Sequence, residues 1–216
     1  MTAAVNIRTI VSMPFEENTY VVWRPGSSDC LVIDPGLQPE LIVDCLREEG
    51  LTLRAILNTH GHADHIGGNA ALKELAPDAP LIIGVGDAIM LTDAEANLSA
   101  GFGLPIVSPP ADRTVREGES IELAGLTLKV LDIPGHSPGH VVFVQDGSPT
   151  QVFGGDVLFR GSIGRYDFPG SNGALLLQGI RRKLFTLPDD TVVYPGHGPV
   201  TTVGHEKRTN PFLAEE

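Results

Sequence analysis

Five of the seven histidines lie in two short, glycine-rich segments, each of which follows an apolar run with β-strand character. The first segment holds His60, His62 and His65, and the second holds His136 and His140. Side chains at the ends of strands stand on a rigid base and can converge on one point. Neither packing nor solubility explains why three imidazoles and the carboxylate of Asp64 lie together in residues 60–65. The first segment therefore predicts a metal site, and the fold must bring further donors to it.

The spacing inside the first segment predicts donors for two ions. His60 and His62 are two residues apart, so in an extended backbone they point to the same side and can bind one ion. Asp64 and His65 lie just beyond them, where the chain turns into a helix, and can serve a second ion.

Two ions need more donors than this segment supplies, and three later residues can supply them. His136 lies in the sequence Pro-Gly-His-Ser-Pro-Gly-His and offers a third imidazole. Asp156 follows Gly-Gly at the end of an expected strand, so its two carboxylate oxygens can bridge both ions. His197, in Tyr-Pro-Gly-His, completes the second set. His140 is expected to support the site without binding metal, and His205 is expected to lie in solvent.

Strand and helix signals alternate along two β-rich halves of the chain. Strands are expected at residues 5–11, 19–23, 31–33, 53–57, 81–83, 119–123, 126–131, 141–144, 152–153 and 191–194. Helices are expected at residues 39–49, 66–75, 87–98 and 173–185. No linker or break in composition divides the chain. We therefore expect one α/β (α+β) domain over residues 1–216, with two packed sheets and helices outside them.

The charge balance excludes several classes of partner. The chain carries 15 Lys and Arg against 27 Asp and Glu, a formal charge of −12 with neutral histidines. Nucleic acids and anionic membrane surfaces both require clustered basic residues, so neither is an expected partner. No apolar stretch approaches the roughly 18 residues of a membrane span, and residues 1–18 do not read as a secretory signal. Cys30 and Cys45 form no CxxC pair and are expected to be buried free thiols, which favours a cytoplasmic location.

Four segments in this order resemble the metallo-β-lactamase superfamily, and within it the glyoxalase II-like (hydroxyacylglutathione hydrolase-like) branch. They are Thr-His-Gly-His-Ala-Asp-His at 59–65, Pro-Gly-His-Ser-Pro-Gly-His at 134–140, Gly-Gly-Asp-Val-Leu-Phe at 154–159 and Tyr-Pro-Gly-His at 194–197. The resemblance covers residues 18–197 and implies an αββα four-layer sandwich with a dinuclear site at one edge of the two sheets. It also implies the metal ligands by position: His60, His62 and His136 for one ion, Asp64, His65 and His197 for the other, and Asp156 between them.

Several departures from the family pattern bear on the substrate. Glyoxalase II continues past its last histidine motif into a helical domain with basic glutathione-binding residues, whereas this sequence ends soon after His197. Arg165 replaces a family lysine, Asp167 replaces a tyrosine, and Gly198 and Pro199 occupy the place of another tyrosine. The usual recognition of glutathione is therefore not expected. The commonest β-lactamases carry cysteine in the region of Gly-Gly-Asp, so hydrolysis of β-lactams is not expected either.

The resemblance implies a metal-dependent hydrolase, and thioesters are the expected substrates. Two divalent ions, expected to be Zn²⁺ with Fe or Mn as alternatives, would lower the pKa of a shared water to about 7. The resulting hydroxide would attack the thioester carbonyl while Asp64, the expected catalytic residue, holds it in place. The thiolate would leave without a general acid because thiols have a pKa of about 8.5. Arg160, Arg165 and Tyr166 are expected to bind an anionic substrate tail, although surface ion pairs explain the two arginines equally well.

Other functions fit parts of the same pattern. A mononuclear iron persulfide dioxygenase would use a two-histidine, one-carboxylate triad of His60, His136 and Asp156, and would leave the second set of donors without a task. A lactone or phosphodiester hydrolase would use the same ions on another substrate. A metal-binding or partner-binding module would perform no catalysis. The sequence leaves open the acyl group, the thiol carrier, the native metal, and the choice between a monomer and a homo-oligomer.

Overall fold

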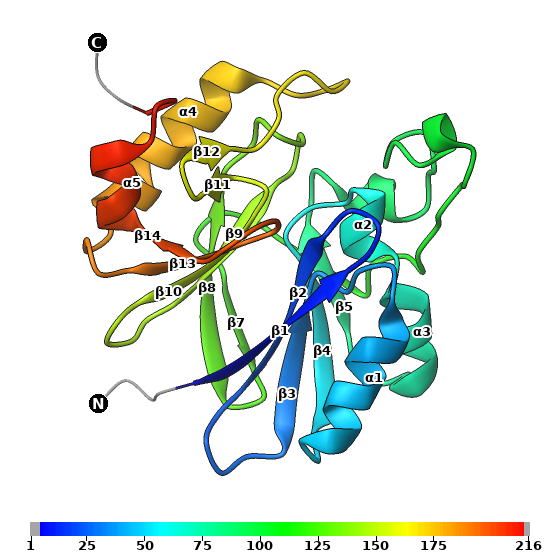
Figure 1. The fold of residues 1–216 in the computed structure, drawn as a ribbon. Coiled ribbons are helices and arrows are strands. Elements are labelled where there is room, and N and C mark those ends of the chain that lie inside the picture. Colours follow the sequence, from blue (N-terminus) through cyan, green and yellow to red (C-terminus); the bar gives the residue numbers. More distant parts are fainter. Residues whose placement is uncertain (1–4, 214–216) are drawn as a thin grey trace.

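Two six-stranded β-sheets pack face to face in the computed structural model, which describes residues 5–213 (Figure 1). The first sheet has the order β1-β2-β3-β4-β5-β6 and consists of β1 (Asn6–Ser12), β2 (Glu17–Trp23), β3 (Asp29–Ile33), β4 (Thr52–Asn58), β5 (Leu81–Gly84) and β6 (Arg113–Val115). The second sheet has the order β14-β13-β10-β9-β8-β7 and consists of β7 (Ser120–Leu123), β8 (Leu126–Asp132), β9 (Val141–Gln145), β10 (Gln151–Gly155), β13 (Val192–Pro195) and β14 (Thr201–Thr202). A separate two-stranded ribbon follows β10 and consists of β11 (Leu158–Phe159) and β12 (Ser162–Ile163).

Helices cover the outer face of each sheet, which gives four layers in the order αββα (Figure 1). The helices on the first sheet are α1 (Pro39–Glu48), α2 (Ala63–Ile66) and α3 (Asn69–Leu75). The helices on the second sheet are α4 (Gly173–Arg182) and α5 (Val203–Thr209). Three short 3₁₀ helices are η1 (Ala88–Leu91), η2 (Ala100–Phe102) and η3 (Leu184–Thr186). The predicted four-layer sandwich is confirmed.

Apolar side chains fill the spaces between these layers. Between the sheets, β8 buries Leu126, Leu128 and Val130 and exposes the residues between them, as expected for a strand with one buried face. β5 is buried throughout, because helices cover one face of its sheet and the second sheet covers the other. Leu176 and Ile180 of α4 fill the space outside the second sheet.

The carboxyl ends of several strands meet at one edge of the sandwich. β3, β4, β5 and β6 run parallel to one another, and β10 runs parallel to β13. β8 has the same direction as β10, since β9 is antiparallel to both. Ligand sites in sheets with parallel strands form where such carboxyl ends meet. The segments that leave these strands carry Asp34, His60, His136, Asp156 and His197.

The helix expected at residues 66–75 is two helices in the structure. α2 ends before Gly67 and Gly68, and α3 begins after them. A β-carbon at Gly67 would lie 2.5 Å from Leu37, so glycine allows the turn before α1 to pack closely at this point. The helix expected at residues 173–185 ends at Arg182 and is followed by η3.

The helix expected at residues 87–98 is wrong. Only the 3₁₀ helix η1 forms there, and the chain then enters a long loop that extends from the sandwich before β6 (Figure 1, green). Asn97 holds this loop by donating Nδ2 to the carbonyls of Met90 (3.0 Å) and Ile106 (2.8 Å). Asparagine side chains commonly compete with helical hydrogen bonds in this way.

Two further expectations from the sequence concern membrane-spanning helices and the cysteines. Among residues 5–213, no helix is long and apolar enough to cross a bilayer. Cys30 and Cys45 are free and buried, as predicted. Burial raises the pKa of the Cys30 thiol to about 12, which keeps it in its unreactive neutral form.

Candidate metal centre

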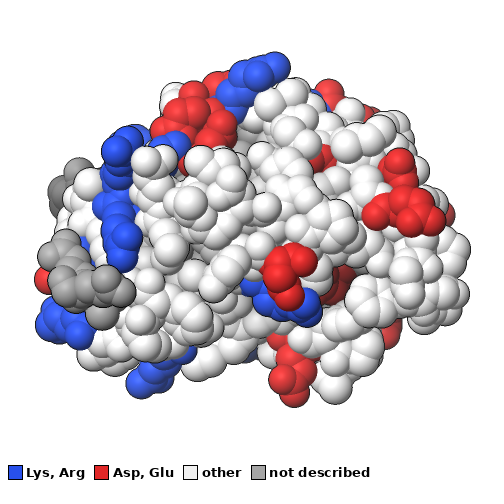
Figure 2. Space-filling model, turned by 90° about the horizontal axis from the view of Figure 1, so that it is seen from above, with Lys and Arg blue, Asp and Glu red and all other residues white. Residues whose placement is uncertain are grey.

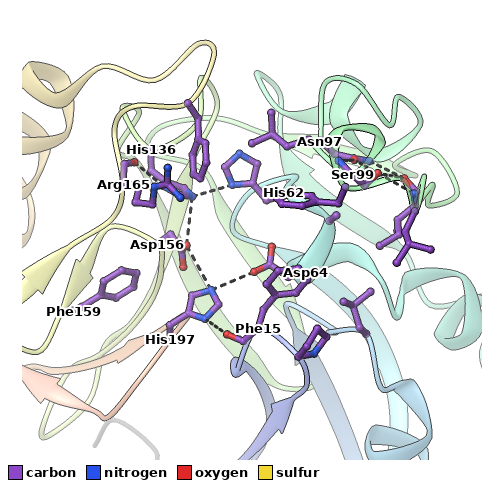
Figure 3. Close-up of a pocket in the computed structure, with 18 residues that line it drawn as sticks. Phe15, His62, Asp64, Asn97, Ser99, His136, Asp156, Phe159, Arg165 and His197 are labelled. Atoms are coloured by element: carbon purple, nitrogen blue, oxygen red, sulfur yellow. Dashed lines mark hydrogen bonds and ion pairs between the residues drawn. The ribbon is translucent and has the colours of Figure 1, made fainter.

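Imidazoles and carboxylates from both sheets converge at a pocket of about 400 Å³ at the common edge of the strands (Figure 3). The segments after β4, β8, β10 and β13 each contribute. The converging residues are His60, His62, Asp64, His65, His136, Asp156 and His197. Both His60 and His65 are fully buried, while the others reach the surface of the pocket. The structure thus brings together every residue expected to bind metal.

His60, His62 and His136 form the first set of donors. One nitrogen from each ring lies within 4.8 Å of the others. Nδ1 of His62 faces Nε2 of His136 at 2.9 Å (Figure 3). Three imidazole nitrogens that face one point are suited to binding a divalent transition-metal ion.

Asp64, His65 and His197 form the second set, with ligand atoms again within 4.8 Å of one another. Oδ2 of Asp64 lies 3.7 Å from Nε2 of His65 and 3.3 Å from Nε2 of His197. This mixed set of one oxygen and two nitrogens also suits a transition-metal ion.

The carboxylate of Asp156 lies between the two sets. Its Oδ2 is 3.4 Å from Nε2 of His136 in the first set and 3.7 Å from Nε2 of His197 in the second (Figure 3). Its Oδ1 is 3.5 Å from Nε2 of His65. A carboxylate placed in this way can bridge two ions through its two oxygens.

Hydrogen bonds at Nδ1 orient four of the imidazoles from behind, so that Nε2 faces the centre of the site. The pairs are His60 with Thr59 Oγ1 (3.1 Å), His65 with Asp34 Oδ2 (3.2 Å), His136 with the Arg165 carbonyl (2.8 Å) and His197 with the Phe15 carbonyl (3.0 Å). Acceptors behind a ligand histidine fix its tautomer and leave the other nitrogen free to bind metal.

Three buried atoms of the site have no hydrogen-bond partner among the described residues, and bound divalent cations would coordinate them. Buried polar atoms almost always have a hydrogen-bond partner. Nε2 of His60, Nε2 of His65 and Oδ1 of Asp156 are nevertheless buried without one among the described residues. All three belong to the converging donors, so two cations would satisfy them. The combination of imidazole and carboxylate donors suits zinc, iron or manganese.

Two rings of the first set, those of His60 and His62, are held neutral. Burial, aided by the neighbouring imidazoles, lowers the pKa of His60. Burial and the proximity of His136 lower the pKa of His62 to about 3. Both rings therefore keep a free lone pair at neutral pH, as a metal ligand requires.

The carboxylates at the second set stabilise the protonated forms of its two imidazoles. Burial favours the neutral form of His65, but the carboxylates of Asp64 and Asp156 outweigh it and raise the pKa of that ring. Burial also opposes the charged form of His197, and its hydrogen bond to Asp64 and the charge of Asp156 outweigh this effect and raise its pKa. Burial favours the neutral form of Asp64 as well, yet His65 and His197 hold the pKa of that carboxyl well below its usual range.

Asp34 is a supporting residue that sequence reasoning missed. It follows β3 with a φ of 50°, a left-handed conformation that aspartate tolerates better than most residues. Its Oδ1 accepts the backbone N–H of Thr59 (2.7 Å), and its Oδ2 accepts the Thr59 hydroxyl (2.7 Å) and faces His65. Asp34 therefore fixes the start of the first histidine segment. The signal was an aspartate before Pro-Gly at the end of a strand.

Asp87 is a second missed residue, and it joins the two histidine segments. Its buried carboxylate accepts the backbone N–H of Gly61 (3.2 Å) in the first segment. In the second segment it accepts the Ser137 hydroxyl (2.5 Å) and the N–H of Gly139 (2.5 Å). One carboxylate thereby fixes the position of the first histidine segment relative to the second.

His140 supports Asp156 and does not face the pocket. Its Nε2 accepts the backbone N–H of Asp156 (3.1 Å), and its ring stacks on His60 at 4.8 Å. Gly155 makes this approach feasible. It adopts a φ of 47°, and a β-carbon there would lie 2.8 Å from Nε2 of His140 and would also clash with the Thr59 hydroxyl.

The structure places the three expected substrate-binding residues differently. Arg165 lines the pocket, where its guanidinium makes a bidentate ion pair with Asp167 (2.9 and 3.0 Å). Tyr166 is half exposed and is absent from the pocket wall. Arg160 lines a separate hollow beside His205, so the structure does not bring it to the donors.

The chain belongs to the metallo-β-lactamase superfamily, whose family model matches residues 13–197. Hydroxyacylglutathione hydrolase GloC from Haemophilus influenzae is 37% identical, over 97% of this chain and 98% of its own length. The crystal structure of BLEG-1 B3 metallo-β-lactamase matches with a TM-score of 0.93 at 37% identity, over 97% of this chain and 100% of that chain. The structure of TTHA1623 in a di-iron-bound form matches with a TM-score of 0.83 at 42% identity, over 95% of this chain and 100% of that chain. The family resemblance seen in the sequence is confirmed.

Metal uptake is expected to release protons from the second set. The raised pKa values of His65 and His197 favour protonated rings in the metal-free protein, and each ring must lose its proton to bind an ion. The apparent affinity for Zn²⁺ should therefore rise with pH, with about one to two protons released near pH 6. Titration calorimetry in buffers of different ionisation enthalpy counts these protons. Uptake without proton release at that pH would contradict this expectation.

Replacing Asp87 with asparagine is expected to weaken metal binding. An amide has a single acceptor oxygen and cannot hold Gly61, Ser137 and Gly139 together as the carboxylate does. Loss of such support typically costs about 10- to 100-fold in metal affinity. Competition with a chromophoric chelator measures the change. The control is Asp112→Asn, which alters a surface carboxylate bound to Leu81 and Lys73 away from the pocket. Equal losses in both variants would refute the role of Asp87.

Proposed function

We propose that this chain is a metal-dependent hydrolase of thioesters that binds two divalent ions. The observation that carries the proposal is the placement of Asp156 between two donor sets, whose buried atoms include some with no hydrogen-bond partner in residues 5–213. The ions would be held by His60, His62 and His136 in one set, Asp64, His65 and His197 in the other, and Asp156 between them. The near full-length similarity to a hydroxyacylglutathione hydrolase supports a thioester as the substrate.

The protein's own residues account for binding and orientation at the reacting centre. When bound, divalent ions would lower the pKa of a water molecule and would act as a Lewis acid toward the carbonyl oxygen. Asp64 borders both the second donor set and the pocket, so its carboxylate can accept a hydrogen bond from the attacking water and orient it. Phe159 and Phe168 line the pocket beside the donors and exclude bulk water from one side. The leaving thiolate needs no proton donor, because thiols have a pKa of about 8.5.

Zinc is the proposed metal for both positions, with iron and manganese as alternatives. Imidazole and carboxylate donors are compatible with each of them. The di-iron-bound form of the structural relative TTHA1623 supports iron as the first alternative. Metal analysis of the purified protein should give about two ions per chain, and one iron per chain would support the mononuclear oxygenase.

Hydrolysis of β-lactams is the second candidate. The sequence argued against it, since Gly-Gly-Asp stands where the commonest β-lactamases carry cysteine. The match to BLEG-1 B3 metallo-β-lactamase over nearly the whole chain favours it again. A β-lactam therefore belongs in the substrate panel beside thioesters and lactones.

Replacing Asp64 with alanine is expected to abolish thioester hydrolysis. The change removes one donor of the second set and the group that orients the attacking water. We expect kcat/KM for S-lactoylglutathione and for simple acyl thioesters to fall by more than about 100-fold, beyond the loss typical of a merely supporting residue. A spectroscopic assay of the released thiol measures the rate.

The control for this variant is Asp78→Ala, which removes an exposed carboxylate outside the site. It should leave the rate unchanged. If the protein consumes oxygen with a glutathione persulfide, and the Asp64→Ala variant keeps this activity, the mononuclear dioxygenase is favoured instead. A β-lactam turned over faster than every thioester would replace the proposed substrate class.

A further inference from the structure

The walls of the pocket beyond the metal donors are almost entirely apolar. The hydrophobic residues that line it are Pro14, Phe15, Leu37, Ala63, Leu98, Phe102, Leu104, Ile106, Phe159 and Phe168. The polar lining residues outside the donor sets are Asn97, Ser99 and Arg165. A substrate that enters this pocket therefore meets hydrocarbon on most sides.

The polar groups of Asn97 and Ser99 are already engaged within their own loop. Asn97 donates to the carbonyls of Met90 and Ile106. The Ser99 hydroxyl donates to the Asn97 side-chain oxygen (2.6 Å) and accepts the N–H of Ile106 (2.9 Å). Figure 3 shows this cluster at the edge of the pocket, turned toward the loop. These side chains build the wall and leave few groups to bind a polar substrate.

Arg165 offers little free charge to a substrate. Asp167 pairs with its guanidinium through two hydrogen bonds, and the guanidinium lies over the ring of Phe168 at 4.2 Å from the ring centre. Among the described residues, no lysine and no second arginine lines the pocket. The anionic substrate tail expected from the sequence therefore has a single, already paired cation to meet.

Aromatic and aliphatic side chains also stand exposed at the mouth of the pocket. Phe102 and Leu104 lie on the loop between η1 and β6 and expose 69% and 72% of their surface. Phe15, after β1, approaches Phe102 across the opening, with ring centres 6.2 Å apart. Figure 2, seen from above onto this edge, shows charged side chains sparsely placed around broad uncharged areas. Exposed apolar side chains gathered around the opening of a pocket are typical of a ligand-binding groove.

The backbone of this loop is strained where it faces the pocket. Leu98 has a φ of 70°, a region that bulky side chains seldom adopt. The bonds of Asn97 and Ser99 hold the turn, and the Leu98 side chain lines the pocket. Strain of this type clusters at ligand-binding sites.

We propose that the pocket selects substrates with a hydrocarbon chain beside the reacting carbonyl, on its acyl or its thiol side. Phe15, Phe102 and Leu104 are the specificity-determining residues, because they form the apolar mouth that such a chain must cross. This inference rests on the proposed thioester hydrolysis for its chemistry. The substrate's hydrocarbon chain would bind because its apolar surface is removed from water, and a bound metal ion would position the carbonyl.

Two series of thioesters test the proposal on the metal-loaded protein. In the first, acyl groups from acetyl to octanoyl are joined to N-acetylcysteamine. In the second, acetyl is joined to thiols from ethanethiol to hexanethiol. We expect kcat/KM to rise about three- to fourfold for each added methylene in one series, as full burial of a methylene predicts. The series that shows the rise identifies the side that the pocket binds.

Substitutions at the mouth supply the matched comparison. The double variant Phe102→Ser/Leu104→Ser should reduce the rise to less than about twofold per methylene. Val107→Ser is the control, since Val107 is also an exposed apolar residue of the same loop (59%) but does not line the pocket. It should keep the full dependence on chain length. Circular dichroism and metal content confirm that each variant is folded and loaded.

Binding of alkyl carboxylates separates this inference from the proposed reaction. The affinity measured by calorimetry should rise with chain length from butyrate to decanoate. In the double variant, this increase with length should disappear. If no thioester is hydrolysed but this rise appears, the proposed function fails and the apolar pocket stands. The inference is overturned if kcat/KM does not change with chain length in either thioester series and the affinity for the carboxylates does not change with length either.

Discussion

The site depends on the cost of burying the carboxylates of Asp64 and Asp156 without positive charge beside them. Removing an ionised carboxylate from water costs several kcal/mol unless a partner compensates it. Five imidazoles surround these two groups, and some of their buried nitrogens have no other partner among the described residues. Metal ions satisfy both requirements at once. The fold must therefore place these donors around one point.

Strand direction and a few buried hydrogen bonds provide this arrangement. Parallel strands deliver donors from both sheets to one edge. Asp34 then fixes the first histidine segment against His65, and Asp87 joins that segment to the second. The long loop after η1 adds Leu98, Phe102, Leu104 and Ile106 to an apolar wall that other segments complete. Phe15, Phe102 and Leu104, which form the proposed apolar mouth, thus lie on segments that carry no candidate metal donor.

The convergence of the candidate metal donors was predictable from sequence because these residues are dense and follow strands. His60, His62, Asp64 and His65 form a cluster that has no other explanation, and Asp156 and His197 each end a recognisable strand. Asp34 and Asp87 were not predictable, since a lone aspartate near glycine or proline also fits an ordinary turn.

Substrate contacts were harder to predict because they depend on where loops fold. Arg160 and Arg165 carry equal charge in the sequence, yet Arg160 lies beside another hollow and Arg165 is paired with Asp167. Residues 87–98 have helical periodicity, but Asn97 closes a loop instead, and this loop supplies part of the apolar wall. A local sequence pattern identifies candidate residues, whereas the tertiary fold determines what each side chain contacts.

Anomalous diffraction from crystals of the zinc-loaded protein tests the central claim most directly. Two peaks about 3.5–4 Å apart are expected. One should lie among His60, His62 and His136, the other among Asp64, His65 and His197, with Asp156 touching both. A single peak bound by His60, His136 and Asp156 at full metal saturation would contradict the dinuclear site.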